Sequence, residues 1–230
     1  MPVSDTRSAS GAGAAPPIGP AGRAFAALVG AVSLASLVGQ YWLLIANTWD
    51  TVGPAFATVR YLSYFTILSN LLVSATCAVA VFGGGSGLAR WLASARVRGG
   101  IALAIGVTGT VYVTILRHLW QPQGAQWWVD SGLHYATPAL YLAWWLAALP
   151  HGGLGWRDLG RWLWFPALYV VWAFLRGQVV HEYPYPFLDV GALGWPAVLR
   201  NSVGVLILFL VFGAGLLGVD RLLGRRRGSD

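Results

Sequence analysis

The chain has 230 residues, of which 57% are hydrophobic and only 10% are charged. Soluble globular proteins carry about 25% charged residues, so this composition excludes a disordered chain, a coiled coil and a conventional soluble enzyme. The net charge is +7, and every basic residue is an arginine. Because the arginines punctuate apolar runs, as they do in membrane proteins, we expect lipids and no nucleic acid as partners. Arginine without lysine, beside abundant Ala, Gly, Pro and Trp, suggests a GC-rich bacterial genome.

Six apolar runs follow a polar N-terminal segment. Residues 1–22 are rich in Ser, Gly, Ala and Pro and are expected to form a disordered tail. The first run, residues 24–46, exceeds the apolar core of a signal peptide, about 7–15 residues, so we expect it to be retained as a span. The other runs are each near the ~20 residues that a transmembrane helix needs; they are residues 61–82, 101–119, 133–149, 162–180 and 196–219.

These runs predict an all-α, polytopic membrane protein with six transmembrane helices in one bundle. Helices are expected because backbone groups in lipid must be hydrogen-bonded within their own segment. Residues 23–220 would form the transmembrane domain, and residues 221–230 a basic cytoplasmic tail.

The arginines indicate the orientation of these spans. The N-terminal tail, the second and fourth connections and the C-terminus hold 11 of the 15 basic residues. The other 4 lie on the opposite side, at Arg60, Arg117, Arg176 and Arg200. Since positive residues favour the cytoplasmic side, the pattern predicts that both termini are cytoplasmic in a multi-pass protein of the cell membrane.

In this orientation the polar residues of five spans fall at one depth, near the outer ends, whereas the inner halves are nearly all apolar. Ionisable residues in membrane spans are costly and usually face a cavity or one another. The layer therefore predicts one buried polar site that opens outward or sideways into lipid. Its members are Ser63, Thr66, Ser69, Asn70, Arg117, His118, Asp130, Ser131, His134, Arg176, Gln178, His181, Glu182, Arg200 and Asn201.

Two residues of the layer have the chemistry of a nucleophile and its base. Thr66 lies about 9 Å inside Arg60, and His134 about 6 Å beyond Asp130, at 1.5 Å per helical residue. A hydroxyl and an imidazole at equal depth on neighbouring spans are the minimum set for nucleophilic catalysis. Whether the two side chains touch does not follow from equal depth.

Local sequence adds detail around both residues. Ser63, Thr66 and Asn70 are spaced to share one helix face. Pro138 follows His134 by four residues and removes the helical partner of the His134 carbonyl, which predicts a kink that aims the imidazole into the bundle.

Our first hypothesis is a lipid-ester hydrolase that needs no cofactor. Thr66 would be the nucleophile and His134 the base, oriented by Asp130. Oxyanion stabilisation, substrate binding or orientation would come from the remaining polar residues of the layer, namely Asn70, Arg117, Arg176 and His181.

Two alternatives stay open. A zinc hydrolase could use His118, His134 and His181, with Asp130 or Glu182, as ligands. A transporter that binds a lipid or an anion without catalysis could use the same layer, although the apolar inner halves of the spans offer it no polar path. A threonine in a membrane helix also often bonds only its own backbone, and interfacial arginines often reach for headgroups.

Three stretches resemble the androgen-induced-protein family of membrane hydrolases and its bacterial six-helix relatives. They are residues 61–72 (YLSYFTILSNLL), 128–142 (WVDSGLHYATPALYL) and 172–191 (WAFLRGQVVHEYPYPFLDVG). The resemblance implies hydrolysis of fatty acid esters of hydroxy fatty acids by an intramembrane threonine with a histidine partner. These two residues map onto Thr66 and His134. Arg176 and Gln178 stand near the place where eukaryotic members carry histidines, which implies a different recognition of carboxylate or headgroup.

Overall fold

The computed structural model describes residues 18–119 and 121–227, and within them it contains helices and no strand. The prediction of an all-helical fold is thus confirmed for these ranges. The α-helices are α1 (Pro20–Thr48), α2 (Gly53–Leu62), α3 (Phe65–Phe82), α4 (Gly87–Ala93), α5 (Ala95–Thr114), α6 (Ala125–Ser131), α7 (Thr137–Ala148), α8 (Trp156–Trp162), α9 (Trp164–Val180) and α10 (Val190–Arg227). Two 3₁₀ turns, η1 (Leu116–His118) and η3 (Pro186–Leu188), and one π-helical turn, η2 (Gly132–Ala136), complete the described part.

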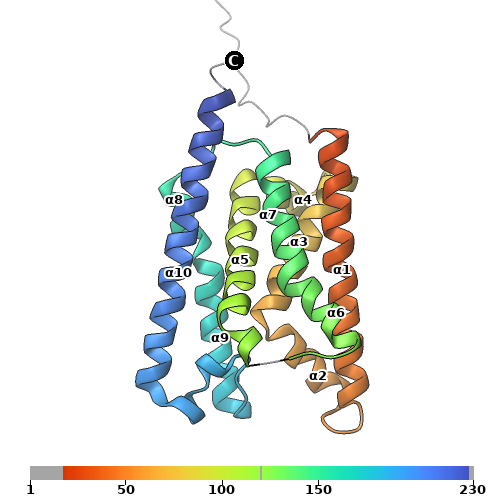
Figure 1. Cartoon of the computed structure of the whole chain (residues 1–230), viewed down its shortest axis with the longest axis vertical. Helices are drawn as coiled ribbons and strands as arrows, with labels where there is room; N and C mark the ends of the chain where they lie inside the picture. Colours follow the sequence, from red (N-terminus) through yellow and green to blue (C-terminus); the bar gives the residue numbers. More distant parts are fainter. Residues whose placement is uncertain (1–17, 120, 228–230) are drawn as a thin grey trace, which may run out of the picture.

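The long helices run along a common axis and form one bundle (Figure 1). Helix α1 begins and α10 ends at the same end of this bundle, which we call the termini end, and α4 and α8 lie toward it. Helices α2 and α6 lie toward the other end, which we call the far end.

In the part of the chain that the structure describes, five helical stretches are long and apolar enough to cross a membrane, as expected for a helical membrane protein. They are Pro20–Thr48, Phe65–Phe82, Ala95–His118, Trp156–Val180 and Val190–Arg225. The predicted span 133–149 is not among them, because the chain there is divided into α6, η2 and α7. The division occurs just before Pro138, whose nitrogen carries no hydrogen for the helical ladder.

Several predicted boundaries differ from those observed. The span expected from residue 61 begins at Phe65, because α2 ends at Leu62 and Tyr64 is extended (φ −91°, ψ 129°). Helix α5 begins six residues before the predicted 101, and α10 begins at Val190 with a non-helical Gly194 (φ 74°).

The predicted tails also differ in part. Helix α1 begins at Pro20, inside the segment expected to be a tail, and α10 continues to Arg227, so most of the predicted basic C-terminal tail is helical. The remainder of both predicted tails, residues 1–17 and 228–230, lies outside the described residues.

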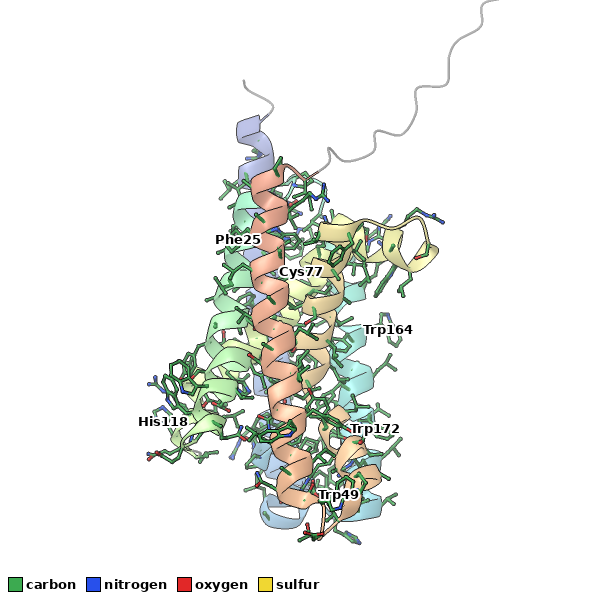
Figure 2. The ribbon with its side chains drawn as sticks, turned by 90° about the vertical axis from the view of Figure 1, so that its right-hand side faces the viewer. Phe25, Trp49, Cys77, His118, Trp164 and Trp172 are labelled. Carbon is green, nitrogen blue, oxygen red and sulfur yellow. The ribbon has the colours of Figure 1, made fainter. Side chains whose placement is uncertain are left out.

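Helix α5 occupies the centre of the bundle, whereas α1, α9 and α10 face outward. In the most apolar part of each membrane-length stretch, 67% of the residues are buried in the stretch that contains α5, but only 22% in each of the stretches that contain α1, α9 and α10. The outer faces carry large apolar side chains, such as Val179 (78% exposed) and Val211 (66% exposed). Figure 2 shows Trp164 and Trp172 of α9 projecting from the bundle. A surface this apolar suits contact with lipid rather than with water.

Candidate functional site

The break between α2 and α3 places Thr66 in the first turn of α3. Its side chain is buried, with 5% of the residue exposed. The first turn of a helix has unpaired N–H groups and the positive end of the helix dipole, which favour a developing negative charge. Ser63 precedes the break, and its hydroxyl donates to the Val59 carbonyl at 2.6 Å. The expectation that Ser63 shares a face with Thr66 is therefore wrong.

The π-helical turn η2 carries His134 toward α3. In this turn the Thr137 N–H donates to the Gly132 carbonyl, one residue further back than in an α-helix. The predicted local distortion before Pro138 thus takes the form of a π turn, a feature that is frequent at functional sites. Gly109 of α5 lies against this turn, because a Cβ there would stand 3.2 Å from the His134 carbonyl oxygen.

The hydroxyl of Thr66 and the imidazole of His134 are in contact. Thr66 Oγ1 lies 3.2 Å from His134 Nε2. On the other side of the ring, Nδ1 lies 3.0 Å from the Asp130 main-chain oxygen and 3.3 Å from Asp130 Oδ1. Both of these atoms are acceptors, so the hydrogen-bond partners assign the imidazole proton to Nδ1. The Nε2 lone pair then faces the Thr66 hydroxyl and can accept its proton.

Tyr112 of α5 holds both members of the His134–Asp130 pair, and the sequence analysis did not identify it. Its hydroxyl donates to Asp130 Oδ2, and its ring stacks on the His134 imidazole at a centroid distance of 4.0 Å and an angle of 16°. These contacts leave the imidazole little freedom to rotate. The sequence could have indicated Tyr112 by its position, because it lies five residues before Arg117 and is therefore close to the polar layer.

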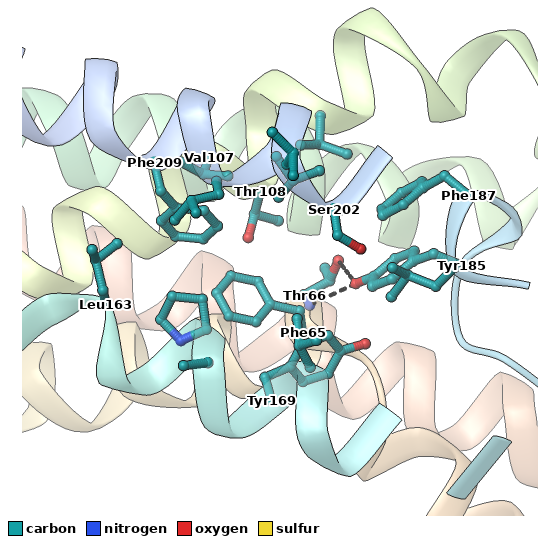
Figure 3. Close-up of a pocket in the computed structure, with 18 of the residues that line it drawn as sticks. Phe65, Thr66, Val107, Thr108, Leu163, Tyr169, Tyr185, Phe187, Ser202 and Phe209 are labelled. Atoms are coloured by element: carbon teal, nitrogen blue, oxygen red, sulfur yellow. Dashed lines mark hydrogen bonds between the residues drawn. The ribbon is translucent and has the colours of Figure 1, made fainter. Parts of the chain in front are cut away.

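Tyr185, which the sequence analysis also did not identify, completes the surroundings of Thr66 (Figure 3). The Thr66 N–H donates to Tyr185 Oη at 3.1 Å, and Tyr185 Oη lies 3.2 Å from Thr66 Oγ1. Since the Thr66 hydroxyl is directed to His134, the Tyr185 hydroxyl donates to Thr66 Oγ1. Burial raises the pKa of Tyr185 to about 12, so the phenol keeps its proton at neutral pH. The sequence could have indicated Tyr185, because it is the first residue of the Y-P-F-L-D stretch.

Thr66 and Tyr185 lie in the wall of a cavity of about 450 Å³ between α3, α5, α9 and α10. This volume is within the range of small-molecule sites, about 300–1,000 Å³. The wall is mostly apolar, and the hydroxyls of Thr66, Thr108, Tyr185 and Ser202 are among its few polar groups (Figure 3).

The cavity extends to the outer surface of α10. Leu199, Val203 and Leu206 line it and are also 55%, 55% and 46% exposed. Because this face of α10 is apolar, a long-chain molecule could reach Thr66 sideways from lipid.

Asn70 is next to the site, but its side chain is directed to main-chain atoms. Its amide donates to the Thr66 carbonyl at 2.8 Å and to the Leu133 carbonyl at 3.3 Å. Its side-chain oxygen accepts a hydrogen bond from Ser33 of α1 at 3.3 Å. Asn70 therefore ties α1, α3 and η2 together, and the expected role in oxyanion stabilisation does not fit these contacts.

Arg117 lines the same polar pocket as Asp130 and is not part of the wall of the apolar cavity. Arg117 and its neighbour His118, which form a hydrogen bond of 3.3 Å, are exposed on η1. Both line a separate polar pocket of about 390 Å³ that also reaches Tyr112 and Asp130. Arg117 can therefore act on Asp130 or on a polar group of a substrate, but not directly on Thr66.

Arg176 and His181 do not contact the Thr66–His134 pair. Arg176 is 5% exposed and donates to the main-chain oxygen of Glu182 at 2.9 Å. Glu182 also pairs with Arg60 of α2 at 2.8 Å and raises the pKa of that guanidinium. His181 ends α9 in a left-handed conformation (φ 54°). This cluster ties α2 to the connection between α9 and α10.

The ligand set of the zinc alternative is not assembled in the described part of the chain, where no three His, Cys, Asp or Glu side chains form a metal-binding group. His118 lies at the side of the bundle (Figure 2), and His134 is engaged with Thr66. His181 belongs to the end of α9.

Comparison of the chain with protein-family models, curated proteins and solved structures gave no match. The resemblance to the androgen-induced-protein family therefore stays a prediction from three short stretches of sequence.

Proposed function

We propose that this protein is an intramembrane lipid-ester hydrolase in which Thr66 is the nucleophile and His134 the general base. The observation that carries the proposal is the chain of contacts from Thr66 Oγ1 to His134 Nε2 (3.2 Å) and from Nδ1 to Asp130 (3.0 and 3.3 Å) at the wall of an apolar cavity. A hydroxyl, a base and a group that orients the base are the components of covalent acyl transfer.

In the first half of the reaction the Thr66 oxygen attacks the ester carbonyl carbon while His134 Nε2 takes the hydroxyl proton. The imidazolium that forms is stabilised by the Asp130 carboxylate. The tetrahedral intermediate collapses, the carbon–oxygen bond to the alcohol breaks, and His134 returns its proton to the leaving alkoxide. The products are a free alcohol and an acyl-Thr66 ester.

In the second half a water molecule attacks the acyl-Thr66 carbonyl. His134 accepts a proton from this water and then protonates Thr66, which releases a carboxylic acid and restores the enzyme. The protonated Tyr185 hydroxyl, at 3.2 Å from Thr66 Oγ1, would donate a hydrogen bond to the oxyanion in both halves. The first turn of α3 adds the positive end of its dipole.

The cavity supports a substrate with long acyl chains, because its walls are apolar and reach the outer face of α10. Fatty acid esters of hydroxy fatty acids are the substrates that the family resemblance implies. We further propose six spans, the divided α6–η2–α7 segment being the sixth, with both termini cytoplasmic. The 11 arginines assigned to that side support this orientation, which places Thr66 toward the outer leaflet of the cell membrane.

A fluorophosphonate probe tests this function in detergent solution. We expect the probe to label the wild-type protein and to fail with Thr66→Ala and His134→Ala, because it reacts only with an activated hydroxyl. Thr108→Ala is the matched control, since Thr108 lines the same cavity but its hydroxyl donates to the Ala104 carbonyl. The same variants are then assayed on a panel of esters, with a chelator added in a parallel arm.

Labelling of Thr66→Ala as strong as that of the wild type would contradict the nucleophile assignment. An absence of labelling in well-folded wild-type protein would favour the non-enzymatic lipid-binding alternative. Loss of ester hydrolysis in the chelator arm alone would favour the metal alternative.

A further inference from the structure

A second cavity lies at the termini end of the bundle and shares no lining residue with the two pockets described above. Its volume is about 470 Å³, and it is lined by side chains from α1, α3, α4, α5, α7 and α10. Two of these are arginines, Arg23 of α1 and Arg98 of α5. In the sequence both arginines count only toward the orientation of the spans.

Arg98 is buried, and no carboxylate of the described residues neutralises its charge. The residue is 7% exposed, and its buried Nε has no hydrogen-bond partner. Among the described residues no carboxylate lies within ion-pair distance of its guanidinium. The guanidinium packs against the Trp144 ring, whose centroid is 5.5 Å from Cζ. A buried charge without a counter-charge is strongly unfavourable.

The fold supplies carboxylates to comparable arginines elsewhere. Arg96, two residues earlier on α5, pairs with Asp158 at 2.6 Å. Arg176, with a similar exposure of 5%, pairs with Glu182. Arg98 also lies in the first turns of α5, where the helix dipole disfavours a cation. A bound anion would neutralise the buried charge of Arg98 and offset its unfavourable interaction with the helix dipole.

The one acidic residue of the cavity wall, Asp220, is directed elsewhere. Its Oδ2 accepts the Leu154 N–H at 2.9 Å, and its Oδ1 lies 3.3 Å from His151 Nδ1. Arg23 uses one nitrogen to donate to the Val81 carbonyl at 2.6 Å, which leaves its other donors available. The cavity therefore combines two guanidinium groups with a single carboxylate that is already paired.

We propose that this cavity binds a phosphate group through Arg98 and Arg23. The guanidinium fork matches the oxygens of phosphate, with charge-assisted hydrogen bonds. The phosphate could belong to an anionic phospholipid headgroup or to a free anion. Apolar wall residues such as Phe82, which is 86% exposed, and Trp145 favour the lipid. Basic pockets between transmembrane helices on the cytoplasmic side are known to bind lipid headgroups.

The test uses the full chain purified in an uncharged maltoside detergent. Phosphatidylglycerol is titrated in one arm and sodium phosphate in another, and both binding and the melting temperature are measured. The variants are Arg98→Leu and Arg23→Gln. Arg90→Gln is the matched control, because Arg90 is an exposed arginine of α4 at the same end of the bundle.

We expect saturable binding that raises the melting temperature of the wild type and of Arg90→Gln. Arg98→Leu should bind about tenfold more weakly or not at all, the loss expected when charge-assisted hydrogen bonds are removed. Without ligand it should be at least as stable as the wild type, because it lacks the unpaired charge. Arg23→Gln, which changes an exposed residue, should weaken binding without loss of folding.

Binding of phosphatidylglycerol alone would identify a headgroup site, and competition by sodium phosphate a site for the free anion. The proposal is overturned if neither ligand binds saturably, if Arg98→Leu binds like the wild type, or if Arg90→Gln loses as much affinity as Arg98→Leu. None of these results depends on ester hydrolysis at Thr66.

Discussion

Replacing Tyr185 by Phe removes one hydroxyl and keeps the ring, which stacks on Phe187 at a centroid distance of 5.2 Å. Two hydrogen bonds with Thr66 are lost, at 3.1 Å to its N–H and at 3.2 Å to its Oγ1. At about 0.5–1.5 kcal/mol for each net hydrogen bond, the free energy of unfolding should fall by about 1–3 kcal/mol. The variant should therefore fold, with a lower melting temperature.

The expected effect on catalysis is larger than the effect on stability. Removal of one oxyanion donor lowers kcat by about 10²–10³-fold in acyl-transfer enzymes. We expect Tyr185→Phe to show a loss of this order in ester hydrolysis, measured at a temperature well below its melting temperature. Labelling by the fluorophosphonate should become slower but remain complete, since Thr66 and His134 are unchanged.

Tyr61→Phe is the matched control for this experiment. Tyr61 is also buried, and its hydroxyl makes one hydrogen bond of 2.7 Å to the Leu37 carbonyl. It should lose stability and keep the wild-type kcat. If Tyr185→Phe retained the full kcat, or if Tyr61→Phe lost as much, the assignment of Tyr185 to the oxyanion would be refuted.

Four further predictions concern stability, catalysis and specificity. Burial raises the pKa of Tyr185 to about 12, so the contribution of Tyr185 to stability should be complete below pH 10 and should decline toward pH 12. The decline should reach at most about 1.4 kcal/mol per pH unit. In alkaline unfolding curves, the free energy of unfolding of Tyr185→Phe should fall less steeply with pH than that of the wild type. Asp130→Asn should lower kcat about a hundredfold or more, less than His134→Ala, because the Asp130 main-chain oxygen still holds Nδ1 at 3.0 Å; equal losses in kinetic assays would contradict this. Glu182→Gln removes the negative charge that pairs with the buried Arg176, and because Glu182 is partly exposed we expect the free energy of unfolding to fall by only about 1–3 kcal/mol. Fluorophosphonate should still label the folded Glu182→Gln variant. Leu163→Trp, at the end of the cavity away from Thr66 (Figure 3), should reduce hydrolysis of long-chain esters more than of short-chain esters, and an unchanged chain-length profile would argue against this cavity as the acyl site.

Composition and periodicity were sufficient to predict the fold class. Apolar runs near the length of a membrane span leave a helix as the only way to pair the backbone in lipid, and the described residues contain five such helical stretches. The sequence also singled out Thr66 and His134 together, although the depth estimated for Thr66 assumed an unbroken helix from Arg60 and the chain is extended at Tyr64. The six predicted spans are not confirmed, because residues 133–149 are not among these stretches. The kink predicted there takes the form of a π turn just before Pro138.

Contacts within the polar layer required the tertiary structure. Side chains at one depth meet only if their helices are rotated toward each other, and the break after Leu62 and the π turn η2 set those rotations for Thr66 and His134. Asn70 lies one helical turn after Thr66, but its side-chain amide is turned to main-chain oxygens.

Residues distant in the chain were the hardest to predict. Tyr185 reaches Thr66 across 119 positions because the connection after α9 folds back over the cavity. Arg98 resembles any other basic residue in the sequence, and only packing shows that it is buried without a carboxylate among the described residues. The sequence by itself determined the helical fold class and the long apolar stretches, because these depend on local composition. The tertiary structure decided which polar groups touch, because contact depends on helix rotation and on the return of loops, which no local pattern encodes.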